Sequence, residues 1–293
     1  MTIISKTVEV GFENGLNVLI IAGVHGNETH AVSAVYSLAR ESFEAELCEY
    51  VNTVTYIFNL NEYGLVSDTR DNLYTNELSN NCNRLFPTNY ETPQEVKDYI
   101  TNLDLSYDLV LDVHNSPYCL PCVLVDYDNN AERLLRPLKG AELVPLVRAT
   151  QIGTIKKHFN GWGSFAYTVE LPEMGVRGNI NESVALLKQF IQVVSKNLHT
   201  SEEGTVPDLQ NILTQQLYTS VNQGIINYTR SSNSITGEYK EGERICEVYD
   251  LADSSHIEYV NAPYDGVLYD IDDNIYSYAG KPFAIYGKKI VLK

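Results

Sequence analysis

The chain has 293 residues, of which 44% are hydrophobic and 20% are charged, an ordinary balance for a globular protein. This composition excludes a collagen, a coiled coil and a wholly disordered chain. Asp and Glu number 38 against 21 Lys and Arg, and the formal charge of −17 argues against nucleic-acid and anionic-membrane partners.

Residues 18–24, the longest apolar run near the start, are far shorter than the roughly 20 residues of a membrane span. No Lys/Arg-rich leader with a cleavage site precedes them. Five cysteines are an odd number, too few for a disulfide scaffold, and they fit a reducing compartment. We therefore expect a soluble, cytoplasmic protein. Cys119 and Cys122 form a CxxC pair without a second pair for a zinc ribbon, so we interpret them as packing residues.

Strand-length apolar runs alternate with helix-length amphipathic segments through the first two thirds of the chain, a pattern typical of an α/β sheet domain. Strands are predicted at residues 7–10, 17–22, 53–58, 107–113, 122–126 and 165–171. Helices are predicted at residues 28–40, 93–103 and 181–198. Residues 59–90 are rich in Asn, Asp, Thr and Tyr without a stable period, which indicates a long functional loop.

The composition changes at residues 200–207, and short Tyr- and Ile-bearing segments follow. Strands are predicted there at residues 224–229, 245–249, 257–260, 266–271, 283–286 and 289–292. These segments indicate a small antiparallel β-domain. The predicted division is a larger α/β domain at residues 1–199 and a C-terminal β-domain at residues 208–293.

Two histidines and a glutamate stand at predicted strand ends. His25 and Glu28 lie in G-V-H-G-N-E (residues 23–28), and His114 lies in D-V-H-N-S (residues 112–116). In an open α/β sheet both segments fall at the C-terminal edge of the strands, where ligands bind. An HxxE pair alone arises by chance, and a strand-end His can cap a helix. Together, however, two imidazoles and a carboxylate hold Zn²⁺ tetrahedrally with an open catalytic position, which predicts one zinc ion per chain.

Glu170 ends a further apolar segment and precedes the loop of residues 171–177. A carboxylate that is not a metal ligand can take a proton from an attacking water and pass it to a leaving amine, provided that burial holds its pKa near neutrality. We therefore predict that Glu170 is the general base. A salt bridge with Arg177 is the alternative for Glu170, and Glu173, beyond Pro172, is the competing carboxylate.

Residues 81–87 have the sequence N-C-N-R-L-F-P, and its Asn-Arg pair suits a substrate carboxylate because a guanidinium binds carboxylates bidentately. Arg70, earlier in the loop, is placed to polarise a scissile carbonyl. Arginines gathered near a metal in so acidic a chain indicate a small anionic substrate.

In chain order these segments resemble the zinc-dependent succinylglutamate desuccinylase and aspartoacylase family, relatives of the M14 metallocarboxypeptidases. The resemblance rests on G-x-H-G-N-E at 23–28, N-R-x-F at 83–86, D-x-H-N-S at 112–116, the spacing around 169–177 and a Tyr-containing segment near 273–284. It implies a carboxypeptidase-like mixed sheet with helices on both faces and a C-terminal β-domain that narrows the entrance. It also implies that residues 1–199 are a zinc-hydrolase catalytic domain that hydrolyses an N-acyl amide on an amino acid or similar small molecule.

The resemblance also assigns roles to single residues. Three of them match the zinc ligands: His25, Glu28 and His114. Two match the catalytic groups, the general base and the carbonyl-polarising arginine: Glu170 and Arg70. The predicted substrate-binding residues are Asn83, Arg84, Asn115, Arg177 and Tyr276. Ten residues before Glu170, where aspartoacylases carry another substrate-binding arginine, this chain has Asn160, with Lys156 and Lys157 nearby as substitutes; this difference argues against N-acetylaspartate as substrate.

Two alternatives remain open at this point. The first is a metallocarboxypeptidase or amidase acting on peptides or peptidoglycan fragments. The second is a catalytically inactive module that binds an anionic ligand, although a pure binder does not need the base Glu170. The sequence does not specify the acyl group, the amine or the oligomeric state. A homo-oligomer stays open. Trp162, between two glycines, either flanks the site or packs in the core.

Overall fold

The computed structural model describes residues 3–41, 43–47, 49–70, 81–84, 94–103, 106–116, 119–127, 131–149, 153–172, 179–200, 211–218, 223–230, 235–250, 253, 255–271, 276–278 and 282–290. Within these ranges, no helix has both the length and the apolar character needed to cross a membrane.

A mixed sheet organises the first part of the chain. Its neighbouring strands are β1 (Ser5–Glu9), β3 (Val51–Ile57), β2 (Leu16–Ile21), β4 (Leu109–Ser116), β7 (Phe165–Pro172), β5 (Cys122–Tyr127) and β6 (Val144–Ala149). The strands β3, β2, β4 and β7 are parallel neighbours, whereas β1 pairs antiparallel with β3 and β5 pairs antiparallel with β7. The described residues of β4 are buried from Leu109 to Asn115, as expected of a parallel strand covered on both faces.

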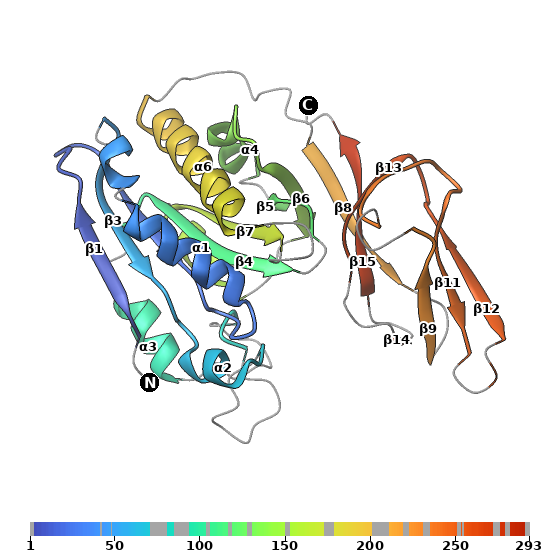
Figure 1. The fold of residues 1–293 in the computed structure, drawn as a ribbon. Helices are drawn as coiled ribbons and strands as arrows, with labels where there is room; N and C mark the ends of the chain where they lie inside the picture. Colours follow the sequence, from blue (N-terminus) through green and yellow to red (C-terminus); the bar gives the residue numbers. More distant parts are fainter. Residues whose placement is uncertain are drawn as a thin grey trace.

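Helices cover both faces of this sheet. On one face, α1 (Thr29–Arg40) and α6 (Ile180–Thr200) lie side by side and share an apolar core with Leu111 and Val113 (Figure 1). On the other face, α3 (Gln94–Asn102) and α5 (Ile155–Gly161) pack into a second core with Val110. Because successive side chains of a strand point to opposite faces, odd- and even-numbered residues of β4 separate into the two cores. The shorter helices are α2 (Glu62–Ser67) and α4 (Ala131–Leu135).

The last part of the described chain is antiparallel and lies beside the helix-covered sheet (Figure 1). β8 (Asn211–Tyr218) continues the first sheet by pairing with β6, and β15 (Pro282–Ile290), β13 (Gly266–Ile271) and β10 (Gly237–Tyr239) follow. A second sheet contains β12 (His256–Asn261), β11 (Arg244–Tyr249), β9 (Gln223–Tyr228) and β14 (Tyr276–Tyr278). Ile226 and Ile245 from one sheet share a core with Leu268 and Tyr286 from the other, so the two sheets pack face to face.

The α/β fold with a smaller C-terminal β-domain is confirmed. Every strand and helix predicted before residue 199 is present, with ends shifted by a few residues. The prediction omitted β6, whose Pro145 is unusual inside a strand, and the short helices α4 and α5. In the C-terminal part it omitted β8, β10 and β14. The separate strands predicted at 283–286 and 289–292 are wrong, because Gly287 and Lys288 continue the ladder with β8 and join them into β15.

The predicted loop at 59–90 contains the short helix α2, while its residues 71–80 and 85–90 lie outside the described residues. Residues 201–207 of the composition change also lie outside them. The predicted domain division therefore stays a prediction. The pairing of β6 with β8 runs the sheet across that division.

Candidate metal centre

The loop after β2 carries the first two predicted ligands, and two glycines shape it. Gly23 adopts a left-handed backbone with φ of +68°. Gly26 lies so close to Gly64 of α2 that a Cβ on it would come within 1.8 Å of the Gly64 carbonyl carbon. Only glycine permits this approach, which brings α2 and the segment after it against the loop that holds His25 and Glu28.

The three predicted ligands converge in the structure. The carboxylate of Glu28 places Oε1 2.7 Å from His25 Nδ1 and Oε2 2.6 Å from His114 Nδ1. The two Nδ1 atoms lie 3.1 Å apart, and all three side chains are buried. Among the residues described by the structure, no other group of three or more His, Cys, Asp or Glu side chains gathers its ligand atoms in this way.

The donor set fits zinc. A tetrahedral ion with ligands at about 2.0–2.1 Å holds its donors roughly 3.3 Å apart. The two Nδ1 atoms are 3.1 Å apart, and the Glu28 oxygens, now at hydrogen-bond distances of 2.6 and 2.7 Å, would move outward slightly to hold an ion. Two imidazole nitrogens and a carboxylate are donors that zinc accepts, and three protein ligands leave a coordination position open. His25, Glu28 and His114 would therefore hold the ion.

Burial and neighbouring charges shift the pKa values of the three side chains in different directions. Burial lowers the pKa of His25, although the Glu28 carboxylate acts in the opposite direction. Burial opposes ionisation of Glu28, but the two histidines outweigh it and lower the pKa of Glu28. Burial also opposes the charged form of His114, yet the carboxylates of Asp112 and Glu28 outweigh it and raise the pKa of His114 well above 6.5. A metal must therefore displace a proton from His114, whereas Glu28 is already ionised.

Asp112 contacts the His114 ring on the side away from Glu28, and the sequence analysis did not predict this contact. Asp112 Oδ1 lies 2.9 Å from His114 Nε2, the ring nitrogen that faces away from Glu28. Metal-binding histidines commonly donate this second N–H to a carboxylate, which fixes the ring orientation. The signal was present in the D-x-H spacing, because residues two apart on a strand share a face.

The predicted substrate-binding Asn83 lies inside the site. Its side chain is buried, and Nδ2 donates to Asp112 Oδ2 at 3.1 Å and lies 3.3 Å from His114 Nε2. Asn81, which the sequence analysis did not single out, places Oδ1 3.3 Å from His25 Nε2. Both asparagines belong to the turn of residues 81–84.

The two predicted arginines lie next to this cluster. Arg70 Nη1 is 3.2 Å from Glu28 Oε1, and its side chain is 54% exposed. Gly26 donates its N–H to the Arg70 carbonyl at 3.3 Å, which links Arg70 to the ligand loop. Arg84 Nη1 donates to the Asn83 carbonyl at 2.6 Å. Arg70 thus stands at the solvent side of the buried ligands.

The register of the sheet places Glu170. In the parallel pair β4 and β7, Glu170 is the direct partner of His114. Opposed residues of neighbouring strands project to the same face, so Glu170 and His114 lie on one face. Glu170 is half-buried and is not part of the ligand cluster. This position is consistent with the predicted role as general base.

Asn115, a predicted substrate-binding residue, projects to the opposite face from His114. Its Oδ1 accepts a hydrogen bond of 2.9 Å from the N–H of Ala31 in the first turn of α1. Glu28 is the N-cap residue of α1 but makes no side-chain capping bond, because its carboxylate faces the histidines. Asn115 supplies the acceptor that the helix end lacks. Its contact with substrate stays a prediction.

Other predicted residues fall outside the described part of the chain. Arg177 and Glu173 belong to the segment 173–178, which is not described. The backbone of Tyr276 belongs to β14, and its side chain lies outside the described residues. The roles of Arg177 and Tyr276 stay predictions.

The structure contradicts the interpretation of Lys156 as a substitute for a substrate-binding arginine. Lys156 is fully buried, and its Nζ lies 2.6 Å from Asp126 Oδ1. Asn160, at the corresponding position, bonds instead with both backbone groups of Ala166. The packing interpretation of the CxxC pair is confirmed, since Cys119 and Cys122 are buried and Cys122 packs in an apolar cluster with Leu124, Leu146 and Tyr269.

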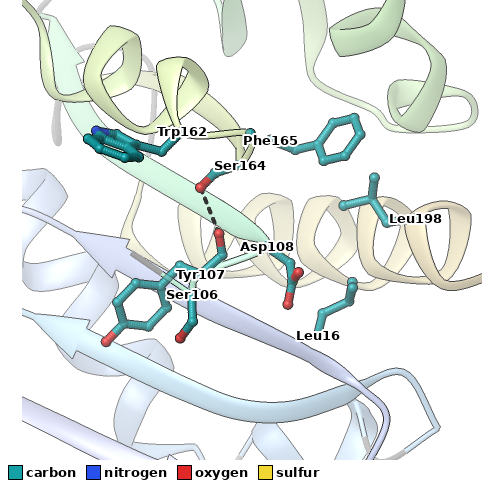
Figure 2. Close-up of a pocket in the computed structure, with 9 residues that line it drawn as sticks. Leu16, Ser106, Tyr107, Asp108, Trp162, Ser164, Phe165 and Leu198 are labelled. Carbon is teal, nitrogen blue, oxygen red and sulfur yellow. Dashed lines mark hydrogen bonds between the residues drawn. The ribbon is translucent and has the colours of Figure 1, made fainter. Parts of the chain in front are cut away.

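A separate shallow cavity of about 350 Å³ lies at the other edge of the sheet, where β2, β4 and β7 begin. Figure 2 shows its lining, with Trp162 and Ser164 facing Tyr107 and Asp108, and Leu16 opposite Phe165 and Leu198. Trp162 is 64% exposed, so it does not pack in the core. It lines this cavity where the strands begin, so it does not flank the ligand cluster at their C-terminal edge. Both interpretations of Trp162 were wrong.

Comparison with known families agrees with this geometry. The family model of the succinylglutamate desuccinylase/aspartoacylase catalytic domain matches residues 14–197, more than half of the chain. The chain belongs to this family. The desuccinylase/aspartoacylase family comprises hydrolases of small acyl amino acids, so its reaction class is the hydrolysis of amide bonds.

Solved structures of desuccinylase/aspartoacylase proteins share the fold. An aspartoacylase family protein from Mesorhizobium loti is 20% identical with a TM-score of 0.75, over 98% of this chain and 89% of that one. A succinylglutamate desuccinylase/aspartoacylase from Rhodobacter sphaeroides is 20% identical with a TM-score of 0.71, over 98% and 88%. The ectoine utilization protein EutE (DoeB) from Ruegeria pomeroyi is 16% identical with a TM-score of 0.72, over 97% and 88%. Among curated proteins, no sequence matches the chain.

Proposed function

We propose that this chain is a zinc-dependent amide hydrolase that deacylates an N-acyl amino acid or a similar small carboxylate-bearing amide. The observation that carries the proposal is the buried convergence of His25, Glu28 and His114, with Glu170 in register beside His114. The family supports the reaction class. The donor set supports one zinc ion per chain.

The chemistry follows from the positions of the side chains. A zinc ion held by His25, Glu28 and His114 would supply a Lewis acid that polarises a carbonyl and acidifies water. Glu170 is not a ligand, so it can remove a proton from the attacking water and deliver it to the leaving nitrogen. Arg70 stands beside Glu28 and donates hydrogen bonds to the carbonyl oxygen as negative charge develops there.

Charge supports an anionic substrate. The formal charge of −17 repels anions in general, so a carboxylate-bearing molecule needs local cations to bind. Arg70 and Arg84 supply these cations next to the cluster. We assign Arg84 to the substrate carboxylate because a guanidinium can bind a carboxylate through two parallel hydrogen bonds. Asn83, Asn115, Arg177 and Tyr276 complete the proposed set of substrate contacts. The proposed partner is thus a small anionic molecule, without a nucleic acid or a membrane.

The test is a panel of N-acyl amino acids in which the acyl group and the amino acid vary separately, with short peptides and peptidoglycan fragments in parallel. Zinc-loaded wild type should release free amino acid from at least one N-acyl amino acid, and Glu170→Gln should keep its zinc and lose turnover. Cleavage of peptides alone would favour the metallocarboxypeptidase alternative. Binding of the anions without turnover would favour the inactive module.

The cytoplasmic location and a homo-oligomer stay predictions. Size-exclusion chromatography with light scattering, at several protein concentrations, measures the oligomeric state. Fractionation of the native host measures the location.

A further inference from the structure

The cavity of about 350 Å³ where β2, β4 and β7 begin is separate from the metal cluster. The cluster lies at the opposite ends of the same strands. Asp108 precedes β4 and His114 lies six positions further along, which is about 20 Å of extended chain. A ligand in this cavity would therefore touch neither the metal ligands nor Glu170.

The loop that carries Trp162 holds this side chain firmly in solvent. The N–H groups of Trp162, Gly163 and Ser164 donate to carbonyl oxygens of α5 at 3.0, 3.3 and 3.2 Å. Gly163 turns the chain with a φ of +98°. Arg133 donates to the carbonyls of Gly163 and Ser164. The backbone thus fixes a large aromatic side chain that is 64% exposed, and rigid aromatic side chains commonly anchor ligands.

The rest of the cavity is also held by hydrogen bonds. Ser164 Oγ donates to the Tyr107 carbonyl at 2.7 Å, a bond drawn in Figure 2. The Asp108 carbonyl accepts a bond of 2.8 Å from the N–H of Phe165, and the Asp108 N–H donates to the Asn17 carbonyl at 2.9 Å. The cavity therefore exists before a ligand arrives, which lowers the entropic cost of binding.

Asp108 is the one charged residue among the described residues that line the cavity. Its Oδ2 accepts a bond of 2.8 Å from the N–H of Asn17. Within the described ranges, no lysine, arginine or histidine pairs with this half-buried carboxylate. The carboxylate repels an anion, and a neutral ligand removes its water without returning a charge. A cation is the ligand that this carboxylate favours.

Aromatic and apolar side chains flank the carboxylate. Trp162 and Tyr107 lie to one side of Asp108, and Leu16, Phe165 and Leu198 lie to the other (Figure 2). Aromatic faces attract organic cations, and apolar side chains bury the hydrocarbon part of a ligand. The volume lies near the lower end of the range for small-molecule sites, roughly 300–1,000 Å³.

We propose that this cavity binds a small organic cation, a primary ammonium that carries an apolar or aromatic body. The ammonium donates to the Asp108 carboxylate, and the body packs against Trp162 and the apolar side chains. The net charge of −17 adds a general attraction for cations. This inference does not rest on the proposed function, because the cavity and the metal cluster lie at opposite edges of the sheet.

The test uses the emission of Trp162, the one tryptophan in the sequence, in the full chain. An indole that loses contact with water emits at shorter wavelength. Phenethylamine should therefore cause a blue shift that saturates, whereas collisional quenching does not saturate. Neutral phenethyl alcohol and anionic 3-phenylpropionate should bind at least about 10-fold more weakly, because neither makes a charge-assisted hydrogen bond with Asp108 as a cation does.

Two substitutions in the cavity separate its charge from its aromatic surface. Asp108→Asn keeps an acceptor for the N–H of Asn17 and removes the charge, so it should weaken phenethylamine binding by about 10-fold or more. Trp162→Ala should weaken it by about 2- to 5-fold, the size of an exposed cation–π contact. Isothermal titration calorimetry measures the Kd of both variants, because the second has no tryptophan.

Asp265→Asn is the matched control. It makes the same change in net charge at an exposed carboxylate that pairs with Lys240 in the C-terminal part of the chain. Its Kd for phenethylamine should equal that of the wild type. An equal loss of affinity in this control would show that only the net charge matters and would overturn the inference.

Other outcomes would also overturn it. These are equal Kd values for phenethylamine and phenethyl alcohol, and the absence of a saturable shift up to about 10 mM amine, the weak end for a ligand of this size. A Kd that differs between zinc-loaded and metal-free protein would place the amine at the metal cluster instead. Tighter binding of Nα-acetyl-lysine amide than of phenethylamine would assign the cavity to a lysine of a partner protein.

Should Asp108→Asn fail to fold, the three ligands of different charge decide with the wild type alone. A preference for the cation that is independent of zinc supports the proposed site, and equal affinity for the three ligands refutes it.

Discussion

The buried pair of Lys156 and Asp126 gives the largest stability effect that we expect from a single substitution. Lys156 Nζ lies 2.6 Å from Asp126 Oδ1, and the two side chains are 0% and 1% exposed. Asp126 Oδ2 has no hydrogen-bond partner among the described residues. Lys156→Ala would therefore leave a buried carboxylate without its counter-charge.

Removal of one member of a buried pair lowers the free energy of unfolding by roughly 3–5 kcal/mol, because the remaining charge is uncompensated. Total stabilities are about 5–15 kcal/mol, so a large share would be lost. The double variant Lys156→Met with Asp126→Leu removes both charges and should recover most of the loss, since apolar replacements of buried pairs are often neutral. Loss in the single variant and recovery in the double would show that the charge matters more than the packing.

The assay is urea unfolding followed by circular dichroism, because the single Trp162 is already 64% exposed and its emission would report little. Glu132→Ala is the matched control, since Glu132 pairs with Arg136 at 2.6 Å with side chains 60% and 53% exposed. This surface pair should contribute no more than about 1 kcal/mol. A Lys156→Ala protein within about 1 kcal/mol of the wild type would refute the reasoning.

Other predictions concern the metal centre and the thiols. Glu170→Gln should keep zinc, as measured by elemental analysis, but lose a factor of about 10²–10⁴ or more in kcat, because proton transfer is removed and the ligands remain; unchanged turnover would contradict the assignment. His114→Ala should lose zinc and activity together, and full zinc occupancy in that variant would exclude His114 as a ligand. The pKa of His114 is raised in the metal-free protein, so this residue carries a proton below that pKa, and zinc affinity should fall as the pH falls. Titration calorimetry in two buffers of different ionisation enthalpy should detect release of that proton at pH 7, and its absence would show that His114 is already neutral. Burial raises the pKa of the Cys246 thiol to about 12, so the thiol should stay protonated at pH 8 and resist iodoacetamide in the native protein. Peptide mapping measures the rate of labelling. A rate in the native protein equal to the rate in urea would contradict this prediction.

Local patterns in the sequence were sufficient for the central elements and for the convergence of the predicted ligands. Strand and helix periods depend on neighbouring residues, so the central strands and α1, α3 and α6 were predicted with small errors at their ends. The convergence of His25, Glu28 and His114 was predictable for a related reason. Residues that follow buried parallel strands meet at one edge of a sheet, whatever the details of packing.

Partners of polar side chains depend on which distant segments meet, and only the tertiary structure decided them. Asn83 makes buried contacts with Ile155, 72 positions away, and with Asp112, 29 positions away, which no local pattern in the sequence shows. Lys156 on a short polar helix is typical of a solvated residue until Asp126 packs against it. Periodicity and strand ends are properties of the local chain, whereas the burial of one amide or ammonium group is a property of the assembled fold.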